Sequence, residues 1–486
     1  MPTLNQENVR HLLRRTEIVD RPDRVAHLLT LGTIEAAVDD VMNVPANPPS
    51  ASFAGIPANS NWRQGVRLSE HWMDQMASVE RSFGERMAFF WHGHICSELG
   101  KVESALAMQE QVDLFRRRGL GPAAAGSSVA ELVKTMAIQV AMLRYLDNDQ
   151  NYANSPNQNF ARELMELFLL GVGNYTEADV EAATAAWTGH NRPRWDINEY
   201  VFDEERHDST PQQFLGREIN QGDPREGGND TINVILGLGP LGVGKIPPGA
   251  EKNQGRPSNE VAAEFLSYKL WQEFGEAASR TVPSGVAAAM RRALIENDFA
   301  IRPWVAAMLT HDDFYATATK TGLVRQPVEF LVANMIALGL DSERAGQLWL
   351  LDQAGQQPLY PPNVSGWKPN GYWVNASAMG ARQLIVQGCL WALQGDTWAG
   401  DAGYIQFGEN NANRLTKIEI QGRWQDGIDP ISDEEFVDRV ILYTGLRPPA
   451  STRDRVLAHL GHPDVAAWMR FDALFLLLSA PEMHIA

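Results

Sequence analysis

The stretch Asn157-Gln-Asn-Phe-Ala-Arg-Glu-Leu-Met-Glu-Leu-Phe-Leu-Leu-Gly-Val-Gly-Asn-Tyr-Thr-Glu-Ala-Asp-Val-Glu-Ala-Ala-Thr-Ala-Ala-Trp-Thr-Gly-His190 decides the fold. It predicts two helices that meet at a glycine turn. The first helix is apolar nearly all round, and only Arg162, Glu163 and Glu166 interrupt it. A helix of this kind is usually buried, and buried charges need partners. We therefore expect an interior helix with one charged sector at the centre of the molecule.

Helical periodicity continues on both sides of this stretch. Apolar residues recur every three to four positions through most of the 486 residues, and 44% of the chain is hydrophobic. The Thr176-Glu-Ala-Asp179 sequence matches a capping box at the start of the second helix. The predicted fold class is therefore mostly α, a multi-helical globular protein with two long irregular loops, 191–255 and 359–376, and at most small β-hairpins.

Breaks in the periodic pattern suggest how the chain is organised. Residues 1–45 predict an N-terminal helical cap, and residues 46–394 predict the main helical body that carries both loops. An insertion, with room for a small hairpin, is expected at 395–430, followed by C-terminal helices at 431–486. We expect these parts to form one integrated unit.

Charge and composition exclude several classes of protein. The net charge is −18, and Lys and Arg do not cluster beyond Arg116-Arg117-Arg118, so nucleic acid is not an expected partner. The two cysteines cannot form a disulfide framework or a CxxC metal motif. No apolar run is long enough for a transmembrane segment. The N-terminal residues do not form a signal-peptide pattern, which favours a cytoplasmic protein.

Histidines near a glycine suggest a metal site. Phe89-Phe-Trp-His92-Gly-His94 ends an apolar helical pattern, and a break at Gly93 is needed to turn both imidazoles to one side. On a continuing helix the rings point about 200° apart. His190 follows Gly189 at the end of the 157–190 stretch. The functional interpretation is a divalent metal held by His92, His94, His190 and a glutamate; the alternative is one core histidine and one capping histidine.

Two further groups of residues are candidates for acid–base chemistry. Glu163 and Glu166 are three residues apart, which places their Cβ atoms about 5–6 Å from each other on one helix face. They predict catalytic carboxylates or, alternatively, an internal network with Arg162 and other arginines. In the irregular region, His207 is followed by Asp208, which could orient the imidazole ring. A surface turn is the alternative there.

An aromatic loop supplies candidate substrate-binding residues. Trp367, Tyr372 and Trp373 lie close to Asn375 in a segment rich in proline, and Arg382 follows one turn into the next predicted helix. Rings of this kind stack on a sugar or a planar ligand, while amides fix its orientation. The alternative is an ordered loop that seals the core.

Several unlike motifs resemble one family when they are taken together. They are the opening His11-Leu-Leu-Arg-Arg-Thr16, the 157–190 stretch, Phe265-Leu-Ser-Tyr-Lys-Leu-Trp-Gln-Glu-Phe274 and Pro361-Pro-Asn-Val-Ser-Gly-Trp367. In this order they resemble the bacterial DUF1800 family. The resemblance implies a large, mostly helical protein without an established activity. It also implies that export is common, and that a protein of the DUF1501 family is a possible partner.

Two functions follow as hypotheses. The first is an enzyme with a polar pocket of histidine and glutamate residues, with a divalent metal ion as the expected cofactor. The second is a non-catalytic protein that uses the aromatic loop to hold a glycan, another small molecule or a protein partner.

Overall fold

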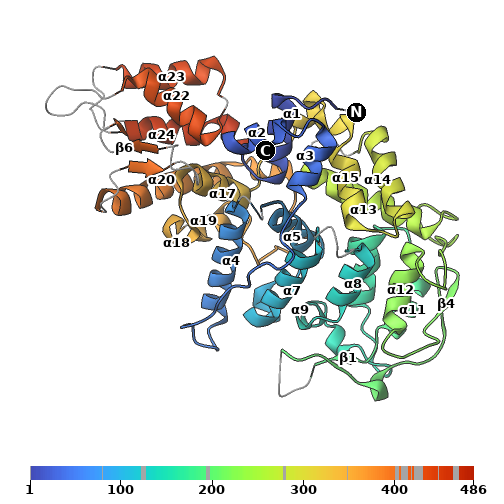
Figure 1. Ribbon diagram of the computed structural model, residues 1–486. Coiled ribbons are helices and arrows are strands. Elements are labelled where there is room, and N and C mark those ends of the chain that lie inside the picture. Colours follow the sequence, from blue (N-terminus) through green and yellow to red (C-terminus); the bar gives the residue numbers. More distant parts are fainter. Residues whose placement is uncertain are drawn as a thin grey trace.

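The computed structural model describes residues 2–78, 80, 82–121, 127–192, 198–276, 281–346, 348–399, 404–406, 414–416, 419–420, 431–446, 448–462 and 470–486. Within them the protein is mostly helical, and its strands form only two-stranded sheets. The predicted fold class is confirmed. Figure 1 shows the C-terminal helices at one end of the molecule and the hairpins near β1 and β4 at the other.

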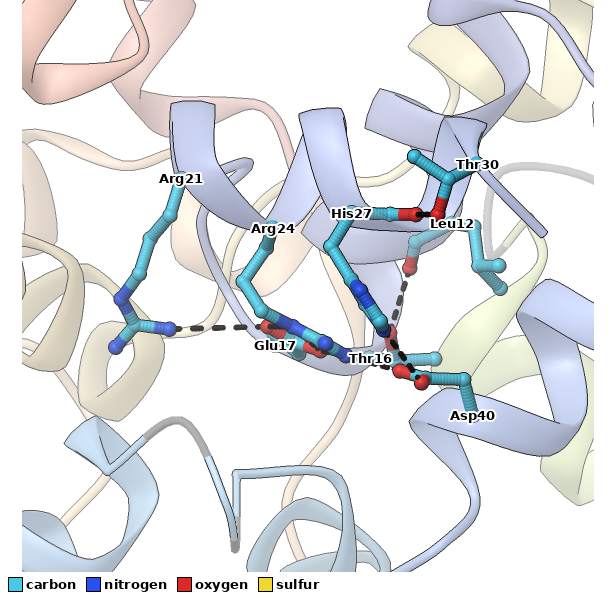
Figure 2. A network of polar contacts seen from close by, with 8 residues as sticks. All are labelled: Leu12, Thr16, Glu17, Arg21, Arg24, His27, Thr30 and Asp40. Carbon is cyan, nitrogen blue, oxygen red and sulfur yellow. Dashed lines mark hydrogen bonds and ion pairs between the residues drawn. The ribbon is translucent and has the colours of Figure 1, made fainter.

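The N-terminal cap consists of three short helices held together by ion pairs. They are α1 (Gln6–Thr16), α2 (Pro22–Leu29) and α3 (Ile34–Val41). The Arg24 guanidinium lies between Glu17, at 2.6 Å, and Asp40, at 2.7 Å, and His27 Nε2 lies 2.8 Å from Asp40 (Figure 2). Opposite charges therefore join the end of α1 to both following helices.

The central helices carry the first wall of the candidate site. The helical periodicity of residues 68–90 is divided between two helices, and that of residues 129–145 is also divided between two. The helices of this part are α4 (Asn61–Ala77), α5 (Ser82–His94), α6 (Leu99–Val102), α7 (Ala105–Arg118), α8 (Val129–Ala137), α9 (Val140–Tyr145) and η1 (Asn148–Gln150). Helix α5 packs against both α4 and α7, so both ends of α5 are buried.

The stretch 157–190 begins with an interior helix whose pitch changes halfway along. It runs as α10 (Asn159–Glu163), continues as a π-helix, η2 (Leu164–Leu169), and turns at Gly171 and Gly173 into α11 (Glu177–Ala186). Its apolar side chains are buried, and the Thr176–Asp179 capping box is present. The prediction of two helices around a glycine turn is confirmed. The π-helix was not predicted from sequence.

The irregular region 191–255 holds more structure than its composition predicts. Two antiparallel hairpins form, β1 (His190–Asn191) with β2 (Val201–Phe202) and β3 (Gln212–Phe214) with β4 (Arg217–Ile219), separated by η3 (Glu204–Arg206). They are followed by α12 (Gly227–Leu236), which the sequence did not predict because its glycines and asparagine are poor helix formers. Its buried apolar side chains, packed on α8, α11 and α13, override that low propensity.

The second half of the chain supplies the other walls. Its elements are α13 (Ser258–Phe274), α14 (Ser284–Glu296), α15 (Ile301–Leu309), η4 (Asp312–Tyr315), α16 (Thr317–Thr321), α17 (Pro327–Leu338), α18 (Ser342–Ala345), α19 (Leu348–Gln353), η5 (Asn370–Trp373) and α20 (Ala376–Ala399). Helix α17 is buried along its whole length and packs on α4 and α20. It therefore connects the central helices to the C-terminal part.

The C-terminal part begins with the hairpin of β5 (Tyr404–Gln406) and β6 (Arg414–Thr416), as expected for the insertion. The rest of the predicted 395–430 insertion is largely outside the described residues. The chain ends with α22 (Asp433–Thr444), α23 (Ala450–Leu460), α24 (Arg470–Leu478) and η6 (Pro481–His484). A search of the described helices finds none that could cross a membrane.

Candidate functional site

A small pocket lies where four segments of the chain meet. It has a volume of about 80 Å³ and lies between the end of α5, the C-terminal half of α13, the start of α17 and the loop that follows Leu359. Aromatic rings and polar side chains both contribute to its walls, which are formed by Phe89, Phe90, Gly93, His94, Lys269, Gln272, Glu273, Gln326, Ser365, Trp367, Pro369 and Trp373. Three residues predicted from the sequence are present: His94, Trp367 and Trp373.

The end of α5 does not break at Gly93. The helix continues through His94, so the expectation of a turn at this glycine is wrong. Gly366 instead allows a close approach of the aromatic loop to the end of α5: a Cβ atom built on Gly366 would lie only 1.9 Å from the Gly93 carbonyl oxygen. The Trp367 ring lies 3.5 Å from the position that a Cβ of Gly93 would occupy. Glycine is needed at Gly366 because two backbones meet there, whereas a Cβ at Gly93 would make an ordinary van der Waals contact with the indole ring.

His92 and His94 consequently have different partners. His92 Nε2 accepts a hydrogen bond from the Leu359 amide at 3.3 Å, whereas His94 Nε2 lies 2.9 Å from the Phe168 carbonyl oxygen. Burial lowers the pKa of each imidazole to about 3, so both rings are neutral at pH 7. His92 holds the aromatic loop, and His94 joins the pocket to the π-helix.

The described residues do not fit the metal hypothesis. They contain no group of three or more His, Cys, Asp or Glu side chains placed to hold an ion. His92 and His94 point apart on a continuous helix, and His190 Nδ1 lies 2.9 Å from the Tyr200 hydroxyl at the hairpin β1–β2.

Helix α13 contributes an ammonium group and a carboxyl group one turn apart. The Lys269 Nζ lies 5.4 Å from the centroid of the Phe265 ring, and Lys269 forms no ion pair within the described residues. Burial lowers the pKa of this lysine. Burial disfavours the charged form of a lysine, and an ion pair would offset that cost. Lys269 has the contact with the Phe265 ring but no such ion pair among the described residues.

Glu273 is held by amides rather than by a cation. The Gln326 side chain donates a hydrogen bond to Glu273 Oε1, and Gln356 in turn donates to Gln326. Burial, reinforced by the nearby Glu329 carboxylate, raises the pKa of Glu273 to about 7. Its carboxyl group can therefore both release and accept a proton near neutral pH.

Sequence reasoning did not select Lys269 or Glu273. Both belong to a segment, Phe265–Phe274, that was noted only for its family resemblance. The sequence does carry a signal for them. The apolar residues Leu266, Leu270 and Trp271, all buried in the structure, lie close to both charges on the helix and leave little solvated surface for them. The partner Gln326 is 53 positions away from Glu273, which no local pattern could indicate.

The aromatic loop is anchored to the end of α5. Trp367 stacks on Phe89 with ring centroids 5.3 Å apart and planes inclined by 11°. The Cys96 thiol donates to the Val364 carbonyl oxygen at 2.9 Å, and the Leu99 amide donates to the Leu359 carbonyl oxygen at 2.9 Å. Trp367 is consequently fixed as one wall of the pocket.

Other residues predicted to bind substrate have structural contacts. Tyr372 is 58% exposed, and its hydroxyl accepts a hydrogen bond from Lys368 Nζ. Asn375 Oδ1 accepts from the Ala378 amide at the start of α20. Arg382 is fully buried, donates to the Arg325 carbonyl oxygen and contacts His484. None of these three side chains lines the pocket.

Glu163 and Glu166 lie beside the site rather than in its walls. The guanidinium of Arg162 pairs with Glu177, at 2.7 Å, and it opposes the rise in the pKa of Glu163 without forming an ion pair with that residue. Glu166 accepts a hydrogen bond from the Tyr175 hydroxyl at 2.6 Å. Burial, followed by repulsion from Glu166, raises the pKa of Glu163, and one of its carboxylate oxygens has no hydrogen-bond partner. An arginine network around the two glutamates is not observed among the described residues.

The π-helix connects these glutamates to the pocket. Because the helix ends at Leu169, the Phe168 carbonyl oxygen is one of the last four without a partner inside the helix, and it lies 2.9 Å from His94 Nε2. Single π-helical turns are frequent at functional sites. The interior helix therefore supports the pocket from behind.

His207 and Asp208 belong to the hairpin end of the molecule. His207 Nδ1 lies 2.9 Å from the Thr188 carbonyl oxygen, and its Nε2 lies 3.2 Å from Asn220 Oδ1. Asp208 Oδ1 accepts hydrogen bonds from the amide and hydroxyl of Thr210, so the carboxylate closes a turn. The two side chains contact different partners and do not line the pocket.

The comparisons with known proteins identify the family. The sequence profile of DUF1800, described as a protein of unknown function, matches residues 11–238 and 257–485. The chain belongs to the DUF1800 family. No curated protein and no solved structure matches it. Both walls of the pocket, on α5 and on α13, lie within the matched segments of this DUF1800 protein.

Proposed function

We propose that this DUF1800 protein is an enzyme that carries out acid–base chemistry on a small carbonyl compound in the α5–α13 pocket. One observation carries the proposal: Lys269 and Glu273 stand one helical turn apart in an aromatic-walled pocket, and neither is neutralised by an ion pair with a described residue. Ionisable groups in such surroundings are candidates for catalysis.

Glu273 is assigned the proton transfer. A catalytic acid or base works best when its pKa lies near the working pH, and the pKa of Glu273 is raised to about 7. In the ionised form Glu273 removes a proton from the carbon next to the carbonyl group, and it returns that proton in the second half of the reaction. Gln326 orients the carboxyl group through its amide.

Lys269 is assigned the stabilisation of negative charge. When a proton leaves the carbon beside a carbonyl group, charge moves to the carbonyl oxygen, and a nearby ammonium stabilises it strongly in a partly desolvated site. Because no described carboxylate pairs with Lys269, its positive charge is available to a ligand.

The walls indicate the size and character of the substrate. A volume of about 80 Å³ accommodates a polar group of a few heavy atoms rather than a sugar. Phe90, Trp367 and Trp373 provide flat apolar surfaces for the adjoining carbon chain or ring. Ser365 is exposed at the rim, where the rest of a larger substrate would extend.

A substrate panel with matched variants tests the proposal. Small keto acids, esters and aldehydes would be followed by mass spectrometry and by hydrogen–deuterium exchange at the carbon beside the carbonyl group. We expect Glu273→Gln to lower turnover by about 100-fold or more, whereas Glu264→Gln, an exposed change on the same helix, should have no effect. Turnover that survives Glu273→Gln would contradict the assignment.

A binding role for the aromatic loop is the second candidate. Tyr372 and Val374 are each 58% exposed, although nearby Trp373 is buried. Exposed apolar side chains of this kind can contact a glycan or a protein. A protein of the DUF1501 family is the partner that the family resemblance implies. Under this alternative, Tyr372→Ser combined with Val374→Ser abolishes partner binding, and Glu273→Gln does not.

A further inference from the structure

A chain of hydrogen bonds leads from the pocket to the first turn of α17. Gln326, which lines the pocket, donates to Glu273 Oε1, and Gln356 donates to Gln326 Oε1. The Val328 backbone amide in turn donates to Gln356 Oε1 at 3.0 Å. These four residues therefore form one continuous sequence of donors and acceptors, which we call the amide relay.

The relay has only one direction. A glutamine side chain can usually be turned by 180° with little change of shape, which exchanges its donor and its acceptor. The Val328 amide can only donate, so the oxygen of Gln356 faces it and the NH₂ group of Gln356 faces Gln326. The oxygen of Gln326 is then occupied, and its NH₂ group faces Glu273. Glu273 Oε1 consequently meets a donor rather than an acceptor.

The far end of the relay is held rigidly by two helices. Gln356 is fully buried just after α19, and its backbone amide donates to the Leu351 carbonyl oxygen at 2.8 Å. Val328 is the second residue of α17, and the first amides of a helix have no partner inside it. Gln356 supplies that partner. The orientation of the relay is therefore set by the backbone of α17 and not by the pocket.

Several charged groups act on Glu273 together with the relay. Burial raises the pKa of this carboxyl group, and the Glu329 carboxylate of α17 adds to the rise. Arg86 of α5, which is paired with Glu329, and the Gln326 amide both lower the pKa. Lys269, one turn earlier on α13, forms no ion pair with a described residue. Because a donor to a carboxylate favours its ionised form, the orientation of the Gln326 amide affects how readily Glu273 ionises.

We propose that Gln356 is a positioning residue, which fixes the Gln326 amide so that Glu273 Oε1 always accepts a hydrogen bond and Oε2 is the oxygen that gains and loses the proton. Gln356 lies behind Gln326 and outside the pocket walls, so it acts on Glu273 only through the relay. Its importance for catalysis rests on the proposed function, whereas its effect on the protonation of Glu273 does not.

Substitution of Gln356 tests the relay. Gln356→Met removes the donor to Gln326 without adding a charge, so Gln326 can turn and offer its oxygen to a protonated Glu273. The midpoint for titration of Glu273, followed by ¹³C NMR of the labelled carboxyl group, should rise by about one pH unit. Gln353→Met makes the same change at the exposed last residue of α19 and should leave the midpoint unchanged.

A second variant tests the relay if the methionine variant does not fold. The ionised side chain of Gln356→Glu can accept from Val328 but cannot donate to Gln326, so it should also raise the midpoint. An unchanged midpoint in Gln356→Met, or in Gln356→Glu if the methionine variant is unfolded, would overturn the proposal.

The pH dependence of turnover separates the relay from the proposed enzyme. With a substrate that is turned over, the pH–rate profile of Gln356→Met should shift by the same amount as the NMR midpoint. A shifted midpoint without turnover of any carbonyl compound would support the relay and contradict the proposed enzyme. Turnover that depends on Glu273 but keeps its pH profile in Gln356→Met would support the enzyme and overturn the role of Gln356.

Discussion

Two clusters of charge contact the same helix, α5, and they are built differently. On one side Arg116 is fully buried between Glu85, at 2.7 Å, and Asp113, at 3.0 Å. On the other side Lys269 and Glu273, one turn apart on α13, line a pocket and form no ion pair within the described residues. The N-terminal network of Glu17, Arg24 and Asp40 is of the first kind (Figure 2).

The comparison separates charges that hold the fold from charges that are available to a ligand. A buried pair is costly to break, because removal of one partner leaves the other uncompensated. A buried charge without a partner already carries that cost in the folded state. Replacing such a charge with an apolar residue should therefore not destabilise the fold, and the charge is available to a ligand.

The largest expected effect comes from breaking the paired cluster. Arg116→Met should lower the free energy of unfolding by about 3–5 kcal/mol, because Glu85 would stay buried without its cation. Urea denaturation measures the change. Arg256→Met, which removes a half-exposed pair with Glu264, is the control and should cost less than about 1 kcal/mol. Equal losses in the two variants would remove the distinction between buried and exposed pairs.

The second prediction concerns the pH dependence of stability at the pocket. The pKa of Glu273 is raised from its ordinary value of 4.5 to about 7, so the folded protein holds this proton more tightly than the unfolded chain does. This contribution is full below about pH 4.5 and is lost as pH rises through about 7. Relative to Glu273→Gln, the wild type should lose up to about 3 kcal/mol of unfolding free energy between pH 5 and pH 8. Denaturation of both proteins across this range measures it, and a constant difference would contradict the raised pKa.

A third prediction tests the loop that closes the pocket, a feature that the paired cluster lacks. In Gly366→Ala the new methyl group meets the Gly93 carbonyl oxygen at a residue with φ of +73°, which should cost about 2 kcal/mol and detach Trp367 from Phe89. Tryptophan fluorescence should shift to the red. Gly371→Ala has open space around its Cβ position and serves as the control. An unchanged spectrum in the Gly366 variant would show that the loop is not anchored at this glycine.

The smallest effect is expected at Lys269. Since no described carboxylate pairs with it, Lys269→Met should leave the free energy of unfolding unchanged or raise it by about 1 kcal/mol. Turnover, in contrast, should fall strongly. A loss of stability as large as that of Arg116→Met would mean that Lys269 is a structural charge after all.

Much of the fold follows from local patterns in the sequence. The apolar stripes predict most helices correctly, and the Thr176–Asp179 capping box forms as predicted. The interior position of the 157–190 stretch also follows from its composition. Helix α12 was missed because burial against neighbouring helices outweighs its poor propensity.

The site was harder to predict, because its residues meet through contacts between distant segments. The sequence predicts a break at Gly93, whereas α5 continues through it and the glycine that the close approach requires is Gly366. Glu163 and Glu166 attracted attention through their spacing, but Arg162 turns to Glu177 and the pocket forms elsewhere. Glu273 becomes unusual only when Gln326 and the loop close around it.

Direct titration of Glu273 tests the central claim. The protein would be labelled with glutamate carrying ¹³C at Cδ, and the spectrum of Glu273→Gln would identify the Glu273 signal by its absence. A midpoint near pH 7 is the predicted result, since burial and the Glu329 carboxylate raise the pKa of this group. A midpoint near the ordinary value of 4.5 would contradict it, because Glu273 would then resemble a solvated surface carboxylate.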